Sequence, residues 1–117
     1  MATITKKIPD TIYGANSFCP GCGHGIVVRL VAEVLDEMKA ADDAIGVLAV
    51  GCSCLTNRTL ATDLLQAAHG RAAASAAGIK RLRPGKLVFT YQGDGDAMSI
   101  GIAETLYCAQ RNEKITQ

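Results

Sequence analysis

The sequence predicts an α/β protein of the doubly wound type, with a mostly parallel sheet between helices. Three observations support this. Short apolar runs typical of buried strands, 45–50 and 86–91, alternate with segments of helical periodicity. Each run ends in a glycine-bearing loop, at 51–54 and at 92–96. The chain has 117 residues, enough for one modest domain with a core, which we place over 19–117 after an N-terminal arm over 1–18.

The first half of the predicted domain contains one helix and one strand. Apolar residues at helical spacing predict a helix over about 26–39: Val27, Leu30, Val31, Val34, Leu35 and Met38. The unbroken apolar run 45–50 is typical of a parallel strand covered on both faces. Residues 56–65 are ambiguous between irregular helix and loop. No strand is predicted there.

The second half continues the alternation. An alanine-rich helix is predicted to open at His69-Gly70-Arg71 and to run to about 81, since alanine favours helix and its small side chain allows close approach of a sheet or a subunit. A strand over 86–91 and a helix over 98–111 follow. Residues 115–117 read as the opening of another strand. We therefore expect a fragment of a longer protein, with the domain truncated at its C-terminus.

Composition excludes several classes of function. The formal net charge is +1, with charges of both signs mixed along the chain, so neither nucleic acid nor a membrane surface is indicated as a partner. No apolar run approaches a transmembrane span, and the N-terminus lacks an apolar signal core, which makes the cytoplasm the expected compartment. The five cysteines are then more readily metal ligands, redox groups or core residues than disulfides.

The stretch Gly93-Asp94-Gly95-Asp96 has the composition of a phosphate and metal site. It joins a predicted strand to a predicted helix, whose N-terminal N–H groups favour anions. Glycines let the backbone approach an anion closely, and the Asp94 carboxylate suits Mg²⁺. A simple strand-to-helix turn is the alternative reading of the same four residues.

A second candidate site is Cys19-Pro20-Gly21-Cys22. A Pro-Gly turn between two thiols aims both sulfurs at one point, which suits a metal or a disulfide. Cys22 comes just before a helix N-terminus, which favours its thiolate. A small zinc or thiol-redox module is the alternative function from this motif, although zinc modules usually have two such pairs.

Taken together, these motifs resemble the thiamine-diphosphate-binding (beta) subunit of 2-oxoacid:ferredoxin oxidoreductases. The matching segments occur in the family's order and span most of the chain: CPGCGHG at 19–25, GCS at 51–53, AHGRA at 68–72, GIK at 78–80 and FTYQGDGD at 89–96. The resemblance implies the corresponding fold, of which this chain would be the N-terminal portion. The FTYQGDGD segment looks like the branch acting on 2-oxoglutarate or branched-chain 2-oxoacids.

The resemblance implies three cofactors: thiamine diphosphate, Mg²⁺ and a [4Fe–4S] cluster. Asp94 matches the magnesium ligand, and the family's asparagine partner would lie just beyond residue 117. Cys19, Cys22 and Cys52 match three of the four cluster ligands. Cys54 is an unfavoured fourth, because on extended backbone it would point away from Cys52. Cys108 is expected to be a small buried hydrophobe.

Other positions acquire roles from the same resemblance. His69 and Arg71 match a segment placed to donate hydrogen bonds to the diphosphate or to the substrate carboxylate, and are the candidate catalytic residues. A helix-capping histidine and an arginine in a surface ion pair are the alternatives. For His24 two roles remain open: it contacts the cluster or cofactor, or it caps its own helix. The candidate cofactor-binding residues are Gly51, Ser53, His69, Gly70, Gly93, Asp94, Gly95 and Asp96.

The implied reaction is CoA-dependent oxidative decarboxylation of a 2-oxoacid, with electrons passing to ferredoxin. The implied partner is an alpha subunit, whose pyrimidine-binding domain supplies a glutamate, and gamma and delta subunits are further candidate partners. We expect the isolated chain to be inactive, because nothing in it replaces that glutamate. A non-redox thiamine-diphosphate domain without a cluster is a further alternative, against which the cysteine pattern argues.

Overall fold

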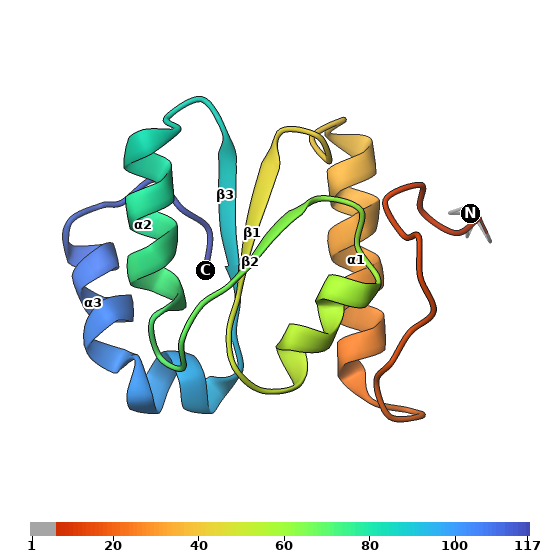
Figure 1. Cartoon of the computed structure of the whole chain (residues 1–117), viewed down its shortest axis with the longest axis horizontal. Helices are drawn as coiled ribbons and strands as arrows, with labels where there is room; N and C mark the ends of the chain where they lie inside the picture. The colour runs from red at the N-terminus through yellow and green to blue at the C-terminus, as the bar shows by residue number, and fades with distance from the viewer. Residues whose placement is uncertain (1–6) are drawn as a thin grey trace, which may run out of the picture.

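A three-stranded parallel sheet forms the centre of the computed structural model, which describes residues 7–117 (Figure 1). The strands lie in the order β2-β1-β3, with β1 at Ala44–Leu48, β2 at Asp63–Gln66 and β3 at Leu87–Tyr91. Both pairings of β1 are parallel, so that Leu48 stands opposite Gln66 on one side and Tyr91 on the other. The predicted parallel sheet is confirmed.

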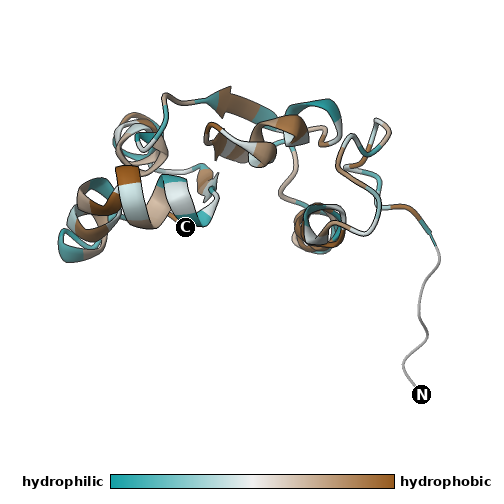
Figure 2. Ribbon diagram, turned by 90° about the horizontal axis from the view of Figure 1, so that it is seen from below, coloured by the Kyte–Doolittle hydropathy of each residue, from teal (hydrophilic) through white to brown (hydrophobic). Residues whose placement is uncertain are grey.

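Helices cover both faces of the sheet, which confirms the doubly wound arrangement. On one face, Val47 and Val88 pack against α2 (Ala72–Leu82). On the other face, Val28 of α1 (Gly23–Glu37) packs in a cluster with Leu64 and Tyr91. Figure 2 shows the strands, largely in the brown of hydrophobic residues, between these two layers.

The alanines of α2 allow two close contacts at once. Ala72 and Ala76 face the sheet, whereas Ala73 and Ala77 pack against Cys108 of α3 (Ile102–Gln110). Cys108 is only 1% exposed, and its thiol donates to the Ala73 carbonyl at 3.5 Å. The expectation that Cys108 is a small buried hydrophobe is therefore confirmed.

The end of the chain adds a residue to the sheet beside β3. Thr116 forms a parallel bridge with Phe89. Its N–H donates to the Val88 carbonyl at 3.1 Å, and its carbonyl accepts from the Thr90 N–H at 2.8 Å. The backbone thus takes up strand pairing where the sequence predicted a strand to open.

Two elements differ from the sequence prediction. Residues 52–66, left without a strand, contain a 3₁₀-helix, η1 (Cys52–Arg58), and then β2. The helix predicted over 98–111 is divided into a π-helix, η2 (Asp96–Ile100), and α3, with Gly101 between them. The Gly101 N–H donates to the Asp96 carbonyl at 2.8 Å, five residues back, which is the π-type hydrogen bond.

The position of α1 also differs from the prediction. It begins at Gly23, three residues earlier than expected, with Cys22 as its N-cap. The helix buries Val28, Ala32 and Leu35. The apolar side chains that suggested a core-facing stripe are largely exposed: Val27, Leu30, Val34 and Met38.

The arm runs against α1 and η1. The backbone N–H groups of Asp10 and Thr11 donate to the Asp36 carboxylate at 2.6 and 3.1 Å, and Ile12 forms an antiparallel bridge with Leu60. Residues 1–6 of the predicted arm lie outside the described residues. Among the helices of residues 7–117, none combines the length and apolar character needed to cross a membrane.

Candidate functional site

The loops that carry the predicted site residues meet at one edge of the sheet. Leu48, Gln66 and Tyr91 stand side by side in the parallel register, so the segments that follow them leave from the same edge. Open α/β sheets bind ligands at this carboxyl edge. The sequence correctly placed the loops after 45–50 and 86–91 together, and β2 brings the His69 turn to join them.

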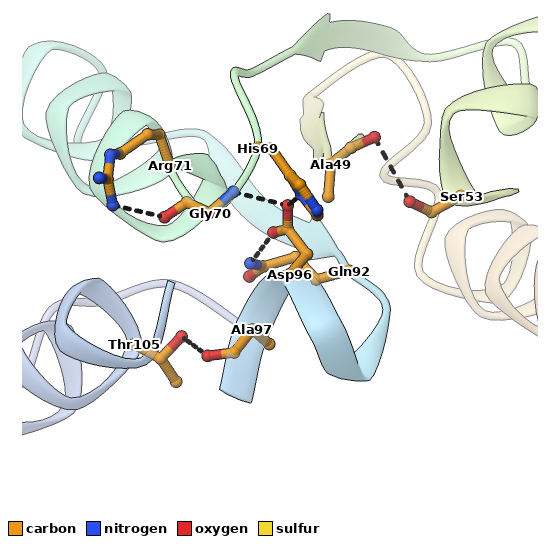
Figure 3. Close-up of polar contacts among 9 residues, drawn as sticks. All are labelled: Ala49, Ser53, His69, Gly70, Arg71, Gln92, Asp96, Ala97 and Thr105. Carbon is orange, nitrogen blue, oxygen red and sulfur yellow. Dashed lines mark hydrogen bonds and ion pairs between the residues drawn. The ribbon is translucent and has the colours of Figure 1, made fainter. Parts of the chain in front are cut away.

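Asp96 ties the His69 turn to the loop after β3 (Figure 3). Its side chain is buried. Oδ1 accepts hydrogen bonds from the Gly70 N–H at 2.7 Å and from His69 Nδ1 at 2.5 Å, and Oδ2 accepts one from Gln92 Nε2 at 2.6 Å. Burial opposes ionisation, but the three donors together lower the pKa of Asp96, so the group is a carboxylate at neutral pH.

Asp94, two residues earlier, has the opposite surroundings. It is exposed, and no residue within 7–117 donates a hydrogen bond to its side chain. A Cβ added to either neighbour, Gly93 or Gly95, would meet no atom within 4 Å. A cation can therefore reach the Asp94 carboxylate, and an anionic ligand can approach the uncovered backbone of the glycine on either side of it.

Side chains of η2 and α3 hold the turn His69-Gly70-Arg71. Gly70 has a φ of 75°, which favours glycine. Arg71 Nη1 forms an ion pair with Glu104 of α3 and donates to the Gly70 carbonyl at 3.3 Å. The surface ion pair that the sequence left open for Arg71 is thus present. Sequence reasoning missed Glu104 as the partner of Arg71, because only the fold brings it near the turn, and it also missed the local bond from Gln92 to Asp96.

The loop after β1 begins with an unusual backbone turn. Gly51 has a φ of 124°, and η1 starts at the next residue. The Ser53 hydroxyl is buried and donates to the Ala49 carbonyl at 3.5 Å, a long bond that lies within the loop (Figure 3). Ser53 therefore helps to shape the loop that lies beside the Asp94 segment.

The predicted cluster ligands lie in two separate loops. Cys19 and Cys52 are exposed, Cys22 is half-buried, and all five cysteines are free thiols. Burial raises the pKa of the Tyr91 hydroxyl, and charge on Cys22 and Cys52 raises it further. Across the described chain, however, no three His, Cys, Asp or Glu side chains are grouped closely enough to hold a metal ion.

His24 joins the first cysteine loop to β3. Its Nδ1 hydrogen-bonds with the Tyr91 hydroxyl, and its ring stacks on Phe18 with centroids 5.0 Å apart. No side-chain hydrogen bond caps α1. Cys52 and Cys54 both lie in η1 rather than on extended backbone, so the argument that their side chains must point apart does not apply.

A family model described as the C-terminal TPP binding domain of thiamine pyrophosphate enzymes matches residues 45–117. The matched segment contains β2, β3, the Asp94 loop and all of β1 except its first residue, Ala44. The chain belongs to this family.

Similar proteins with longer chains narrow the comparison within the thiamine pyrophosphate enzymes. A ketoisovalerate oxidoreductase subunit VorA from Methanothermobacter thermautotrophicus is 42% identical over 96% of this chain and 26% of its own length. A 2-oxoglutarate synthase subunit KorB from Methanocaldococcus jannaschii is 39% identical over 85% of this chain and 37% of its own. This chain therefore spans about a quarter to a third of these relatives.

A solved structure supports the fold over nearly the whole chain. It is a 2-oxoglutarate:ferredoxin oxidoreductase from Magnetococcus marinus with 2-oxoglutarate, coenzyme A and succinyl-CoA bound. The TM-score is 0.86 at 28% identity, with 97% of this chain and 40% of that chain covered. The similarity extends to residues 19–44, which the family model does not match.

The structure allows one comparison between this thiamine pyrophosphate enzyme domain and the needs of a magnesium-bound diphosphate, namely which donor groups are accessible at the sheet edge. Magnesium is usually held by one or two carboxylates together with substrate phosphates and waters. Asp94 offers one exposed carboxylate beside open glycine backbone at the sheet edge. These donors therefore fit such a group, and Asp94 is the carboxylate that would hold the metal.

Proposed function

We propose that this chain is the diphosphate-binding portion of the beta subunit of a 2-oxoacid:ferredoxin oxidoreductase. The observation that carries the proposal is the contrast at the end of β3. There, in a domain of the thiamine pyrophosphate family, Asp94 is exposed between open glycines while Asp96 is buried. One carboxylate holds the loops, and the other is free to meet a metal and its diphosphate.

In this proposal Asp94 holds Mg²⁺, and the backbone of Gly93 and Gly95 lies along the diphosphate. Thiamine diphosphate, when bound, supplies a carbon nucleophile for attack on a 2-oxoacid, and that chemistry belongs to the cofactor. The chain binds and orients it. His69 and Arg71 stand at the same edge as donors to anionic oxygens, and the loop at Gly51 and Ser53 completes that edge.

The substrate class is proposed from the relatives. Their names refer to ketoisovalerate and to 2-oxoglutarate, and the Magnetococcus structure contains 2-oxoglutarate, coenzyme A and succinyl-CoA. We infer a 2-oxoacid substrate, coenzyme A as acyl acceptor and ferredoxin as electron acceptor, in the cytoplasm. An alpha subunit would complete the enzyme, with gamma and delta subunits as further candidate partners, so the isolated chain is proposed to be inactive.

A [4Fe–4S] cluster remains part of the proposal on the strength of the thiols. Cys19, Cys22 and Cys52 provide three candidate ligands in two loops. Residues next to both loops contact Tyr91: His24 hydrogen-bonds with its hydroxyl, and the Ala49 N–H donates to its carbonyl at 3.3 Å. Within residues 7–117 no three His, Cys, Asp or Glu side chains are grouped closely enough to hold a metal ion, so the three cysteines do not form a cluster site as they stand, and no step is derived through the cluster. The zinc or thiol-redox alternative gains no support from the same arrangement.

The test is thiamine diphosphate binding by the native, anaerobically purified enzyme that contains this chain. Asp94→Asn should weaken Mg²⁺-dependent binding by at least about tenfold, because the metal loses its carboxylate ligand. Asp63→Asn is the matched control, since Asp63 is an exposed carboxylate at the start of β2. Iron and thiamine diphosphate are assayed in the same preparation. Equal binding by the wild type and Asp94→Asn would refute the assignment of Asp94.

A further inference from the structure

We propose that Asp96 is a positioning residue that holds the Nδ1–H side of the His69 ring, so that the protonated ring donates from Nε2–H to an anionic oxygen of the bound ligand. The inference rests on the proposed function, because the ligand is the thiamine diphosphate or 2-oxoacid of that proposal. In this inference Asp96 orients His69 and the Gly70 backbone, whereas the sequence predicted that Asp96 contacts the cofactor directly.

Three protein donors occupy both oxygens of the Asp96 carboxylate. Oδ1 accepts from the Gly70 N–H and from His69 Nδ1, at 2.7 and 2.5 Å, and Oδ2 accepts from Gln92 Nε2 at 2.6 Å (Figure 3). Asp96 as a whole residue is 2% exposed. A ligand could reach this carboxylate only by breaking these bonds, which carry the fold of two loops.

The same hydrogen bonds determine which ring nitrogen of His69 is available. A carboxylate can only accept, so the Nδ1 atom that faces it must carry a proton. The hydrogen bond made by Nδ1–H sets the direction in which Nε2–H of the protonated ring can donate. Nε2 is therefore the only nitrogen of His69 that a ligand can contact.

The burial of the two partners places Nε2 on the open side. The side chain of Asp96 is 1% exposed, whereas that of His69 is 42% exposed. Since the Nδ1 side of the ring faces the buried carboxylate, the exposed part lies mainly on the opposite side, which carries Nε2. His69 lies in the loop after β2, which leaves the sheet at the same edge as the Asp94 loop.

Asp96 fixes both the ring and the backbone from which the ring projects. Gly70, which follows His69, adopts a φ of 75°, and its N–H is held by the same oxygen that holds the ring. The direction of the imidazole is therefore set at two points by one carboxylate. Rigid placement of a donor reduces the entropy lost when it binds a ligand.

A double-mutant cycle in the native enzyme tests the inference. Dissociation constants for thiamine diphosphate with Mg²⁺, and KM and kcat for the 2-oxoacid, are measured for Asp96→Ala, His69→Ala and the double variant. Each single change should weaken binding of the ligand that Nε2 contacts by roughly tenfold, the loss of one hydrogen bond to a charged group. The double variant should be little weaker than His69→Ala, because Asp96 acts through His69.

Two further variants separate positioning from general damage. Asp96→Asn keeps an acceptor at Oδ1 for His69 and Gly70, while the Gln92 amide can turn over to meet the new NH₂ group, so we expect affinity within about threefold of the wild type. Thr105→Val removes a nearby helix hydrogen bond, from the Thr105 hydroxyl to the Ala97 carbonyl at 3.0 Å, and should leave affinity unchanged. If Asp96→Ala does not fold, the inference is decided by comparing the ligand affinity of Asp96→Asn with that of His69→Ala.

The two measurements distinguish the sources of the anionic oxygen. A change in the thiamine diphosphate constant assigns Nε2 to the diphosphate, and a change in KM alone assigns it to the 2-oxoacid carboxylate; either supports the inference. Additive losses in the cycle, or an Asp96→Asn loss as large as that of His69→Ala, would overturn it. A wild-type enzyme that binds no thiamine diphosphate would instead overturn the proposed function, and this inference with it.

Discussion

Gly70 and Gly101 touch backbone to backbone, where the His69 turn crosses the end of the π-helix. A Cβ on Gly70 would lie 2.9 Å from the Gly101 nitrogen, and a Cβ on Gly101 would lie 2.7 Å from the Gly70 carbonyl oxygen. Neither position accepts a side chain without moving main chain. The close approach explains how the short side chain of Asp96 can reach both Gly70 and His69.

Gly101→Ala should destabilise the protein by about 1–3 kcal/mol, the usual cost of overpacking. The new methyl would lie 2.4 Å from the carbonyl oxygen of Asp96, which belongs to the rigid π-type turn. Gly78→Ala in α2 is the matched control, because its Cβ would meet nothing within 4 Å and alanine is favoured in a helix interior by about 0.5–1 kcal/mol. Urea unfolding measures both. Equal stability of Gly101→Ala and the wild type would show that the two backbones are not in contact.

Glu113→Gln should flatten the dependence of stability on pH below 4.5. The hydrogen bond from Arg81 is the main cause that lowers the pKa of Glu113 below its ordinary 4.5, with burial opposing it and Arg111 adding to it. The unfolded chain thus binds more protons in that window. The stabilisation is present above 4.5 and is lost as pH falls through the lower folded-state pKa.

The measurement for Glu113 is the unfolding free energy between about pH 2 and 6. Glu37→Gln, which changes an exposed carboxylate at the end of α1, is the control and should keep the wild-type profile. A Glu113→Gln profile as steep as that of the wild type would contradict the Arg81–Glu113 pair.

Long apolar runs were predictable, and short polar elements were not. The strands at 44–48 and 87–91 are rich in apolar residues, so the pattern alone predicted that they are strands and that they lie in a buried sheet. β2 reads Asp-Leu-Leu-Gln, is four residues long and lies at the sheet edge, where the pairing with β1 provides what the sequence pattern lacks. Edge pairing is a tertiary effect that no local pattern reports.

The candidate site was predictable in its location but not in the roles of its two aspartates. Glycine-flanked loops after parallel strands indicated the edge. Whether Asp94 or Asp96 faces inward depends on the π-helix, whose extra residue changes the direction of the chain after Gly95. That turn in part depends on the contact between Gly70 and Gly101, which lie far apart in the sequence.

Thiol labelling of the native, iron-free protein should divide the cysteines by exposure. Cys19 and Cys52 are exposed and should react first with a thiol reagent. Burial raises the pKa of Cys108 and the packing of α2 against α3 closes access to it, so it should react only when the chain unfolds. Mass spectrometry of labelled peptides assigns the order. Rapid labelling of Cys108 in folded protein would contradict the α2–α3 packing.

Cys52→Ala should lower the pKa of Tyr91 towards its ordinary 10.0 in iron-free protein. Burial is the largest cause that raises this pKa, and charge on Cys22 and Cys52 adds to it, so removing one thiolate makes the phenolate easier to form. Absorbance at alkaline pH, taken as a difference from Tyr91→Phe, isolates this residue from Tyr13 and Tyr107. Cys54→Ala is the matched control from the same 3₁₀-helix and should leave the titration unchanged. A titration of Tyr91 that Cys52→Ala does not move would mean that the loop after β1 does not approach Tyr91, and the proposed grouping of Cys52 with Cys22 would lose its structural support.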